Sequence, residues 1–169
     1  GRESLFQAPI ATIEEAAAVL PKDFSESDED IRSRLMGIEG TAGRAYFQCI
    51  SKLLPEKYRF SGRSRQPAKD AFNAALNYCY GILYGRVEKA CIIAGLDPYV
   101  GFLHTDNYNK RSMVYDLVEP FRIWADRTVV TLFTGRRCRE DMFHAGDDGV
   151  VLEKPARELL LGNLNEYLD

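Results

Sequence analysis

Apolar residues recur at three- and four-residue steps along most of this sequence, which is the spacing of an α-helix with one buried face. The longest such stretches begin near Ser27 and end before Pro55, and run from about Pro67 to Ala94. Two-residue alternation, the mark of a half-buried strand, is almost absent. Only residues 150–152 indicate a short extended segment. The pattern therefore predicts an all-α fold of about five packed helices with little or no β-structure.

Local signals predict where the first and third helices begin and end. Thr12 and Glu15 have the spacing of a capping box, so a first helix is expected from Thr12 until Pro21 stops it. Pro67 favours the first turn of the third helix, because its missing N–H is unpaired there anyway. Gly95 is suited to end that helix in a left-handed conformation.

The fourth helix is expected from Ser112, which can cap it, to Thr134. Pro120 removes a backbone donor in its middle and favours a kink there. A last amphipathic helix is expected over residues 155–168. With 169 residues the chain is long enough for one well-formed core. We divide it into an N-terminal helix with an acidic linker, a central helical domain, and a C-terminal helix packed on that domain, at residues 1–30, 31–145 and 146–169.

Charge is distributed unevenly along the chain. The net charge of −3 argues against a nucleic-acid partner, since such domains are usually basic. However, residues 1–31 have a balance of −6, residues 32–145 of +7 and residues 146–169 of −4. A polyanion meets the local charge, so the central segment is the part that suits nucleic acid.

Two other classes are excluded by the sequence. No apolar run approaches the roughly 18–20 residues that a membrane span needs, and no secretory signal is expected. The four cysteines, Cys49, Cys79, Cys91 and Cys138, are scattered without a zinc-binding spacing. We expect a cytoplasmic protein whose cysteines are reduced and serve as small hydrophobic residues.

Glu39 lies among three glycines, Gly37, Gly40 and Gly43, in the middle of a predicted helix. Each glycine costs about 1 kcal/mol relative to alanine in a helix interior, which suggests close approach by another backbone or a ligand. Glu39 is either a solvated surface residue or a residue of that approached face.

Three further residues are of the types that form catalytic or metal-binding sites. Asp116 and Glu119 are three apart, so both carboxylates project from one side of a helix, either as a functional pair or as an exposed pair balanced by Arg122. His104 follows an apolar Gly-Phe-Leu and is either a packed histidine or a ligand. Together with Glu39, these residues could converge on a divalent cation, and carboxylates with one imidazole suit magnesium or manganese. Such a site fits phosphodiester chemistry.

Two basic segments can contact a nucleic-acid backbone. They are the loop over residues 57–69, which contains Arg63, Arg65 and Lys69, and the run of Lys110 and Arg111.

The motifs, taken in order, resemble one family. Their sequences are LMGIEG, RSRQPAKDAFNAALNY, AGLDP, GFLH and YDLVEPFR, at residues 35–40, 63–78, 94–98, 101–104 and 115–122. They resemble the C-terminal helical domain of Cas1, the CRISPR-associated integrase that inserts new spacers, over about residues 31–145. Five ordered motifs are highly specific where one would be weak.

The resemblance implies that the central domain is catalytic. Glu39, His104 and Glu119 would hold Mg²⁺ or Mn²⁺, and Asp116 would be an auxiliary catalytic carboxylate. The implied reaction joins the 3′-hydroxyl of a captured protospacer DNA to a phosphodiester of the CRISPR repeat, and its reverse cuts branched DNA. Tyr84 and Tyr115 fall where family members place tyrosines around the site.

Further expectations follow from the resemblance. Arg122 would face phosphate or pair with Glu119, so it joins Tyr84 and Tyr115 in the implied DNA contact. Family members work in the prokaryotic cytoplasm with a second protein, Cas2, and form homodimers through an N-terminal β-rich domain that we expect to be absent here. Two alternatives stay open: a non-catalytic helical DNA-binding or scaffold domain, and an RNA-binding helical module that uses Arg63, Arg65 and the tyrosines.

Overall fold

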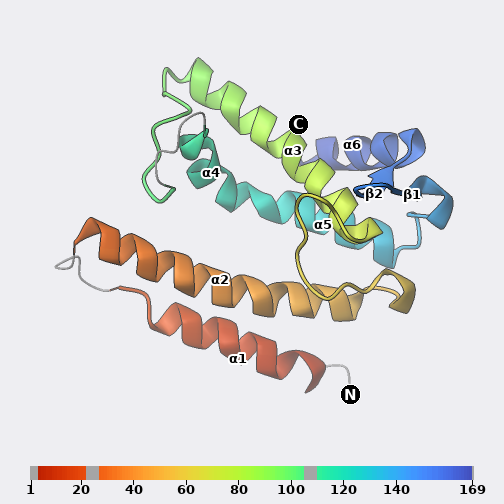
Figure 1. Cartoon of the computed structure of the whole chain (residues 1–169), viewed down its shortest axis with the longest axis horizontal. Coiled ribbons are helices and arrows are strands. Elements are labelled where there is room, and N and C mark those ends of the chain that lie inside the picture. Colours follow the sequence, from red (N-terminus) through yellow and green to blue (C-terminus); the bar gives the residue numbers. More distant parts are fainter. Residues whose placement is uncertain (1–3, 22–26, 105–109, 169) are drawn as a thin grey trace. The chain divides into compact units, whose positions relative to one another are not determined.

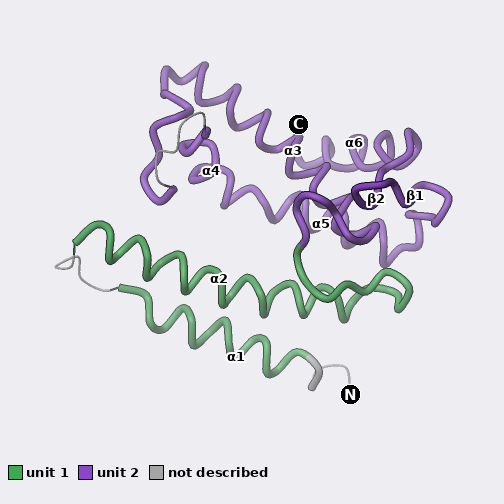
Figure 2. Tube along the Cα trace, viewed as in Figure 1, with its two compact units in different colours: residues 1–63 green, residues 64–169 purple. Residues whose placement is uncertain are grey.

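The computed structural model describes residues 4–21, 27–104 and 110–168, and the part that it describes is mainly helical (Figure 1). The chain forms two compact units, residues 1–63 and residues 64–169 (Figure 2). The predicted all-α class is confirmed, with one small two-stranded sheet. The division into an N-terminal helix with its linker, a central helical domain and a C-terminal helix, at residues 1–30, 31–145 and 146–169, stays a prediction.

The first unit is a pair of packed helices, α1 (Ser4–Ala18) and α2 (Asp28–Leu53), followed by the short turn η1 (Glu56–Tyr58). The expected start of the first helix at Thr12 is wrong, because α1 begins two turns earlier. The Thr12 hydroxyl donates to the carbonyl of Ala8 at 3.1 Å inside the helix instead of capping it.

α2 has the boundaries that the sequence predicts. Ser27 caps it by accepting the N–H of Asp30 at 3.3 Å, and acidic residues fill the first turn, where the helix dipole favours them. The helix ends at Leu53, directly before Leu54 and Pro55. Residues 22–26 of the predicted acidic linker lie outside the described residues.

The second unit is built around α3 (Ala71–Ile93), which packs against every other helix of this unit (Figure 1). The remaining elements are α4 (Ser112–Val118), η2 (Glu119–Phe121), α5 (Arg122–Thr134), η3 (Glu140–Met142), β1 (Phe143–Gly146), β2 (Gly149–Leu152) and α6 (Lys154–Leu168). The core of this unit lies between α3, α5 and α6, where Phe72 and Phe133 meet edge to face with ring centroids 5.4 Å apart.

The sequence predicts the end of α3 correctly but not its start. Pro67 does not open the helix, because Asp70 is the N-cap and its carboxylate accepts the N–H of Asn73 at 2.7 Å. Gly95 ends the helix as predicted, with a φ of +74°. The N–H of Leu96 then donates to the carbonyl of Cys91 at 2.9 Å, which completes a Schellman motif.

The predicted fourth helix is split into α4 and α5 by the 3₁₀ turn η2, which contains Pro120. The kink is therefore confirmed. Ser112 is the first helical residue and not the cap, a position held by Arg111 without a side-chain hydrogen bond. Ser112 is completely buried and lies close to Gly101 of the preceding loop, so its side chain packs in the interior and does not cap the helix.

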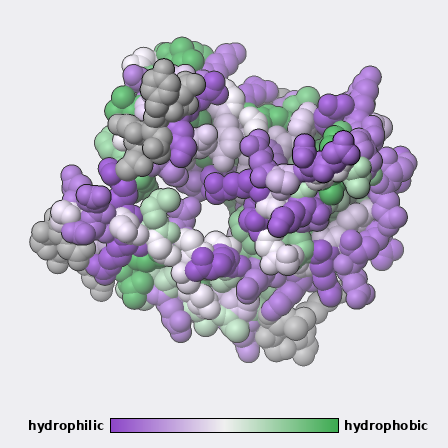
Figure 3. All heavy atoms as spheres, viewed as in Figure 1, coloured by the Kyte–Doolittle hydropathy of each residue, from purple (hydrophilic) through white to green (hydrophobic). Residues whose placement is uncertain are grey.

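The short extended segment at residues 150–152 is confirmed as part of β2, which pairs antiparallel with β1. In the space-filling view, hydrophilic side chains cover much of the visible face and hydrophobic ones gather near the end of α3 (Figure 3). Ile92, Ile93 and Leu96 are exposed there. Within the described residues, no helix is long and apolar enough to span a membrane.

Candidate active site

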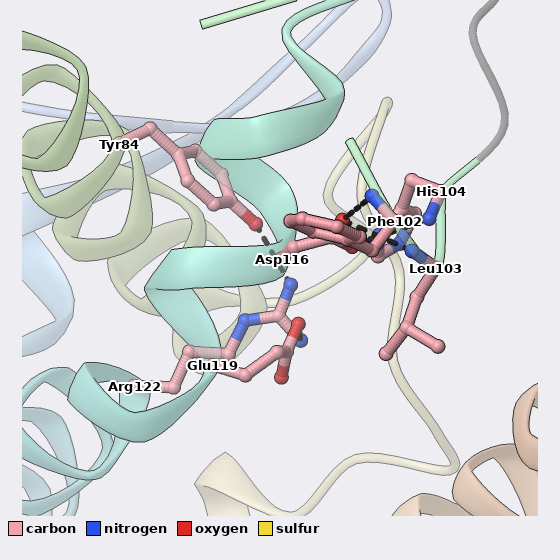
Figure 4. Close-up of polar contacts among 7 residues, drawn as sticks. All are labelled: Tyr84, Phe102, Leu103, His104, Asp116, Glu119 and Arg122. Atoms are coloured by element: carbon pink, nitrogen blue, oxygen red, sulfur yellow. Dashed lines mark hydrogen bonds and ion pairs between the residues drawn. The ribbon is translucent and has the colours of Figure 1, made fainter. Parts of the chain in front are cut away.

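The carboxylate of Asp116, on α4, holds the loop that carries His104. Its Oδ2 accepts the backbone N–H of Phe102 at 2.5 Å and that of Leu103 at 3.0 Å, and its Oδ1 accepts the N–H of His104 at 3.2 Å (Figure 4). Three consecutive amides thus converge on one side chain. This arrangement fixes the path of the loop against α4.

The same carboxylate also contacts the His104 ring. Nδ1 of His104 lies 2.6 Å from Oδ1 of Asp116, and the Asp116 side chain is only 9% exposed whereas that of His104 is 30% exposed. A carboxylate accepts hydrogen bonds, so Nδ1 donates to Asp116 in this contact, and in the tautomer protonated at Nδ1 the lone pair lies on Nε2. Histidines that bind metals commonly have this carboxylate partner on the other ring nitrogen.

The charge of Asp116 is stabilised by its surroundings. Burial on its own would raise the pKa of this carboxyl, but the hydrogen bonds from the His104 ring and from the amides of residues 102–104 outweigh burial and lower the pKa below its usual value. Asp116 is therefore a firmly ionised acceptor.

Gly101 allows the loop to lie so close to α4. A Cβ on this residue would come within 2.6 Å of the Cβ of Ser112 and within 2.9 Å of Oδ2 of Asp116. Only glycine fits such an approach. Gly101 was not among the predicted site residues, although its position three residues before the histidine is a usable signal.

Arg122 organises the second part of the site. Its Nη1 lies 2.9 Å from Oε1 of Glu119, and its Nη2 donates to the hydroxyl of Tyr84 at 3.1 Å (Figure 4). The guanidinium also lies over the Tyr80 ring, 5.2 Å from the centroid. Burial tends to lower the pKa of Arg122, but Glu119 and the tyrosines raise it overall, so the group stays charged. Of the two expected roles of Arg122, pairing with Glu119 is the one observed.

A row of aromatic rings joins the two parts. The ring centroids of Tyr84 and Tyr115 are 5.4 Å apart with an edge-to-face angle of 87°, and Tyr115 lies 5.7 Å from the His104 ring. Tyr80 is buried behind them and donates its hydroxyl to Asp126 at 2.7 Å. Asp116 and Glu119 project from the same side of α4 and η2, one turn apart, as their spacing predicts (Figure 4).

Three comparisons place the chain among known proteins. The family model described as "CRISPR associated protein Cas1" matches residues 1–166. The chain belongs to the Cas1 family. The resemblance seen in the five sequence motifs is thereby confirmed.

Individual Cas1 proteins are similar over most of this chain. A "CRISPR-associated endonuclease Cas1 1" of Archaeoglobus fulgidus is 43% identical over 152 residues, covering 86% of this chain and 44% of the relative. A "CRISPR-associated endonuclease Cas1 3" of Thermus thermophilus is 38% identical over 156 residues, covering 89% of this chain and 46% of the relative. The chain thus spans less than half the length of these curated relatives.

Solved structures show the same fold. A Cas1 protein from Thermotoga maritima aligns with a TM-score of 0.77 and 27% identity, covering 95% of this chain and 48% of that one. A casposase bound to an integration product aligns with a TM-score of 0.76 and 26% identity, covering 99% of this chain and 50% of that one.

The other DNA-contacting candidates of this Cas1-family chain are placed individually. Arg65 and Lys69 are exposed on the loop before α3. Arg111 is exposed and pairs with Glu88 at 2.9 Å between Nε and Oε1. Arg63 belongs to the first unit, where its guanidinium lies 5.3 Å from the centroid of the Phe47 ring.

Glu39 is exposed on α2 in the first unit, whereas His104 and Glu119 belong to the second. Within the described residues, a Cβ on Gly37 or Gly43 would meet no atom within 4 Å, so the expected approach of a backbone or ligand to these glycines stays a prediction. The described part of the chain also contains no cluster of three His, Cys, Asp or Glu side chains that could hold a metal ion. The three-ligand set of Glu39, His104 and Glu119 stays a prediction.

Proposed function

We propose that this chain provides the catalytic helical part of a metal-dependent Cas1 endonuclease and integrase. The reaction joins the 3′-hydroxyl of a captured DNA fragment to a phosphodiester of the CRISPR repeat. The observation that carries the proposal is the position of the Asp116 carboxylate, which lies one helical turn from Glu119 (Figure 4). It holds both the backbone and the ring of His104, and it leaves Nε2 of that ring as the available nitrogen.

The donor atoms fit a divalent cation. In this proposal Nε2 of His104 and the carboxylates of Glu119 and Glu39 would supply an oxygen-rich donor set with one imidazole, which suits Mg²⁺ or Mn²⁺ better than zinc. When bound, such an ion offsets charge on the phosphate and activates an oxygen nucleophile. Asp116 is engaged by four donors, so we assign it to orienting His104 and not to the first coordination sphere.

The other side chains have distinct tasks in this proposal. Arg122 partly neutralises Glu119 and provides a fixed cation beside the reacting phosphate, while Tyr84 keeps the guanidinium in place. Arg63, Arg65, Lys69 and Arg111 contact the DNA backbone through their charge.

Relatives suggest partners for this chain. One neighbour is a casposase bound to an integration product, and another is a Cas6-RT-Cas1–Cas2 complex, which aligns with a TM-score of 0.76 and 26% identity over 98% of this chain and 21% of that one. We propose DNA and Cas2 as partners, with a homodimer as the working assembly and the prokaryotic cytoplasm as the location.

The test is a pair of histidine variants assayed with branched DNA and Mn²⁺. His104→Ala should abolish cleavage and strand transfer without unfolding the protein. His144→Ala is the matched control, because this second histidine is exposed and pairs only with Glu153 on the surface, at 2.7 Å. Full activity of His104→Ala would refute the assignment.

A metal titration separates the enzyme from a non-catalytic scaffold. Calorimetry should show Mn²⁺ binding that is weakened by Glu39→Gln and by His104→Ala. Binding that depends on neither residue would favour the scaffold.

A further inference from the structure

The loop before α3, residues 64–70, is held by side chains of that helix; we call it the cationic loop because it carries Arg65 and Lys69. Nδ2 of Asn77 donates to the carbonyl of Ser64 at 3.1 Å and to that of Arg65 at 2.6 Å. One amide group thus fixes two consecutive peptides of the loop. The Arg65 side chain stays exposed while its own carbonyl is fixed.

A second residue of α3 fixes both ends of the loop. Asn73 is completely buried, and its Oδ1 accepts the N–H of Ser64 at 3.1 Å while its Nδ2 donates to Oδ2 of Asp70 at 2.6 Å. Ser64 closes the loop on itself, since its hydroxyl accepts the N–H of Lys69 at 2.9 Å. Burying an amide is favourable only when its polar atoms are satisfied, and here the backbone N–H of Ser64 and the carboxylate of Asp70 are their partners.

The small β-hairpin supports the loop as well. The N–H of Val150 donates to the carbonyl of Ala68 at 2.8 Å. Gly149 has a φ of +132°, and a Cβ there would come within 2.5 Å of the Ala68 oxygen and 2.8 Å of the Pro67 Cβ. The hairpin turn carries Asp147 and Asp148, so the hairpin contributes support and not positive charge.

A loop fixed in this way lowers the ordering cost of binding. Each side chain or loop segment that becomes immobile at an interface loses conformational entropy, and a preformed backbone removes part of that cost. Several backbone groups of the cationic loop are paired inside the protein, among them the carbonyls of Ser64, Arg65 and Ala68, while its two cations are exposed to solvent. This combination suits a polyanion with regularly spaced charges.

We propose that Asn77 and the β1–β2 hairpin are positioning elements for DNA binding: they preform the cationic loop so that Arg65 and Lys69 meet neighbouring phosphodiesters. The inference rests on the proposed function, in which these two cations contact the DNA backbone. It assigns a role to the half-buried amide of Asn77 and to the only sheet in the described part of the chain.

A double-mutant cycle tests the role of Asn77. Binding of a fluorescently labelled branched DNA is measured by anisotropy in EDTA, so that no cleavage occurs. Arg65→Ala/Lys69→Ala should weaken binding and reduce the salt slope by about two phosphate contacts. Asn77→Leu should weaken binding about 3- to 10-fold, and should have no further effect once both cations are removed.

The hairpin is tested with a pair of glycine variants. Gly149→Ala should weaken DNA binding to a similar degree, because the new methyl group displaces Ala68. Gly162→Ala on α6 is the matched control, since a Cβ there meets no atom within 4 Å in the described part of the chain. It should bind DNA as the unaltered protein does. If Asn77→Leu melts below the assay temperature, Gly149→Ala carries the test.

The outcomes separate the two proposals. If removing Arg65 and Lys69 leaves binding unchanged, the proposed DNA contact is wrong. If removing the two cations weakens DNA binding but Asn77→Leu and Gly149→Ala do not, the positioning role is overturned while the DNA contact stands. The same conclusion follows if Asn77→Leu and Gly149→Ala weaken DNA binding by the same factor in the protein that lacks Arg65 and Lys69.

Discussion

His104 and Asp116 share a short contact, 2.6 Å between Nδ1 and Oδ1, and the same carboxylate accepts the amides of residues 102–104. Asp116 therefore determines two properties of His104 together: where its backbone lies and which ring nitrogen carries the proton. If His104 binds the metal as we propose, Asp116 acts on that metal through the histidine. Its removal should change metal affinity more than it changes the fold.

Asp116→Asn should weaken Mn²⁺ binding by about 10- to 100-fold, the usual effect of losing the partner of a metal-binding histidine. The asparagine has the same shape but offers one acceptor oxygen where the carboxylate offers two, so the loop amides lose a partner. Calorimetric titration measures the affinity. Asp141→Asn is the control, because Asp141 also accepts a hydrogen bond from a side-chain N–H, that of Arg139 Nε at 3.0 Å, but lies exposed on the surface. Equal Mn²⁺ affinity in both variants would contradict this role.

Part of this site was predictable from sequence. The three-residue spacing of Asp116 and Glu119 predicts that they share one helix face, and they do. What could not be predicted is which of the two carboxylates receives the loop. That depends on a tertiary contact, the close approach of Gly101 to Ser112, which no local pattern encodes.

Arg122→Lys should destabilise the protein by about 1–2 kcal/mol. Lysine keeps the charge but loses the planar group that reaches Glu119 and Tyr84 together while lying over the Tyr80 ring. Tyr84→Phe removes only one of these hydrogen bonds and should cost about 0.5–1.5 kcal/mol. Chemical denaturation measures both free energies of unfolding.

A surface arginine provides the comparison for this prediction. Arg127 is exposed and lies over the Tyr167 ring at 5.6 Å, so Arg127→Lys should change the free energy of unfolding by less than about 0.5 kcal/mol. A loss from Arg122→Lys no larger than that from Arg127→Lys would show that the contacts of Arg122 contribute little to stability.

The fold was largely predictable because its helices are long and periodic. The errors are at helix ends, where competing groups decide the outcome. Asp70 replaces Pro67 at the start of α3 because its carboxylate captures the N–H of Asn73, and that capture depends on how the preceding loop folds. Pro120 was a usable signal because its missing backbone donor falls in the middle of a long helical pattern, and the α-helix is interrupted there, although Pro9 inside α1 leaves that helix unbroken.

The buried cysteines should be inert to thiol reagents in the folded protein. Burial raises the pKa of Cys79 to about 12, helped by Cys138 and Asp126, and burial likewise raises that of Cys138 to about 12. Both stay protonated at pH 8, and Cys91 is buried as well. A thiol titration of the native protein should therefore show one fast-reacting cysteine, the partly exposed Cys49, and four after unfolding.

The same pKa shifts determine the response to alkaline pH. In the unfolded chain these thiols ionise near pH 9, whereas in the folded protein they do so only near pH 12. The stabilisation is therefore complete below about pH 8 and is lost as pH rises from 9 toward 12. Cys79→Ala should flatten this alkaline decline, while Cys49→Ser should leave it unchanged and remove the fast thiol reaction. A native protein with several fast-reacting thiols would contradict the prediction.

Helices α3 and α5 both end in a Schellman motif, but a different residue type adopts the left-handed conformation in each. α3 uses Gly95, whereas α5 uses Arg136, with a φ of +57° and the same pair of hydrogen bonds, from Arg136 to Phe133 at 3.1 Å and from Arg137 to Leu132 at 2.9 Å. A side chain in this conformation costs about 1–2 kcal/mol, partly offset by the greater entropy that glycine loses on folding.

Arg136→Gly should therefore stabilise the protein by about 0.5–1 kcal/mol, which corresponds to a rise of about 1–4 °C in thermal midpoint. Arg137→Gly is the control, because it relieves no left-handed residue and removes the contact with Asn163 at 2.9 Å, so it should lower the midpoint. Differential scanning calorimetry measures both. A lower midpoint for Arg136→Gly would show that the exposed arginine makes a stabilising contact that outweighs its backbone conformation.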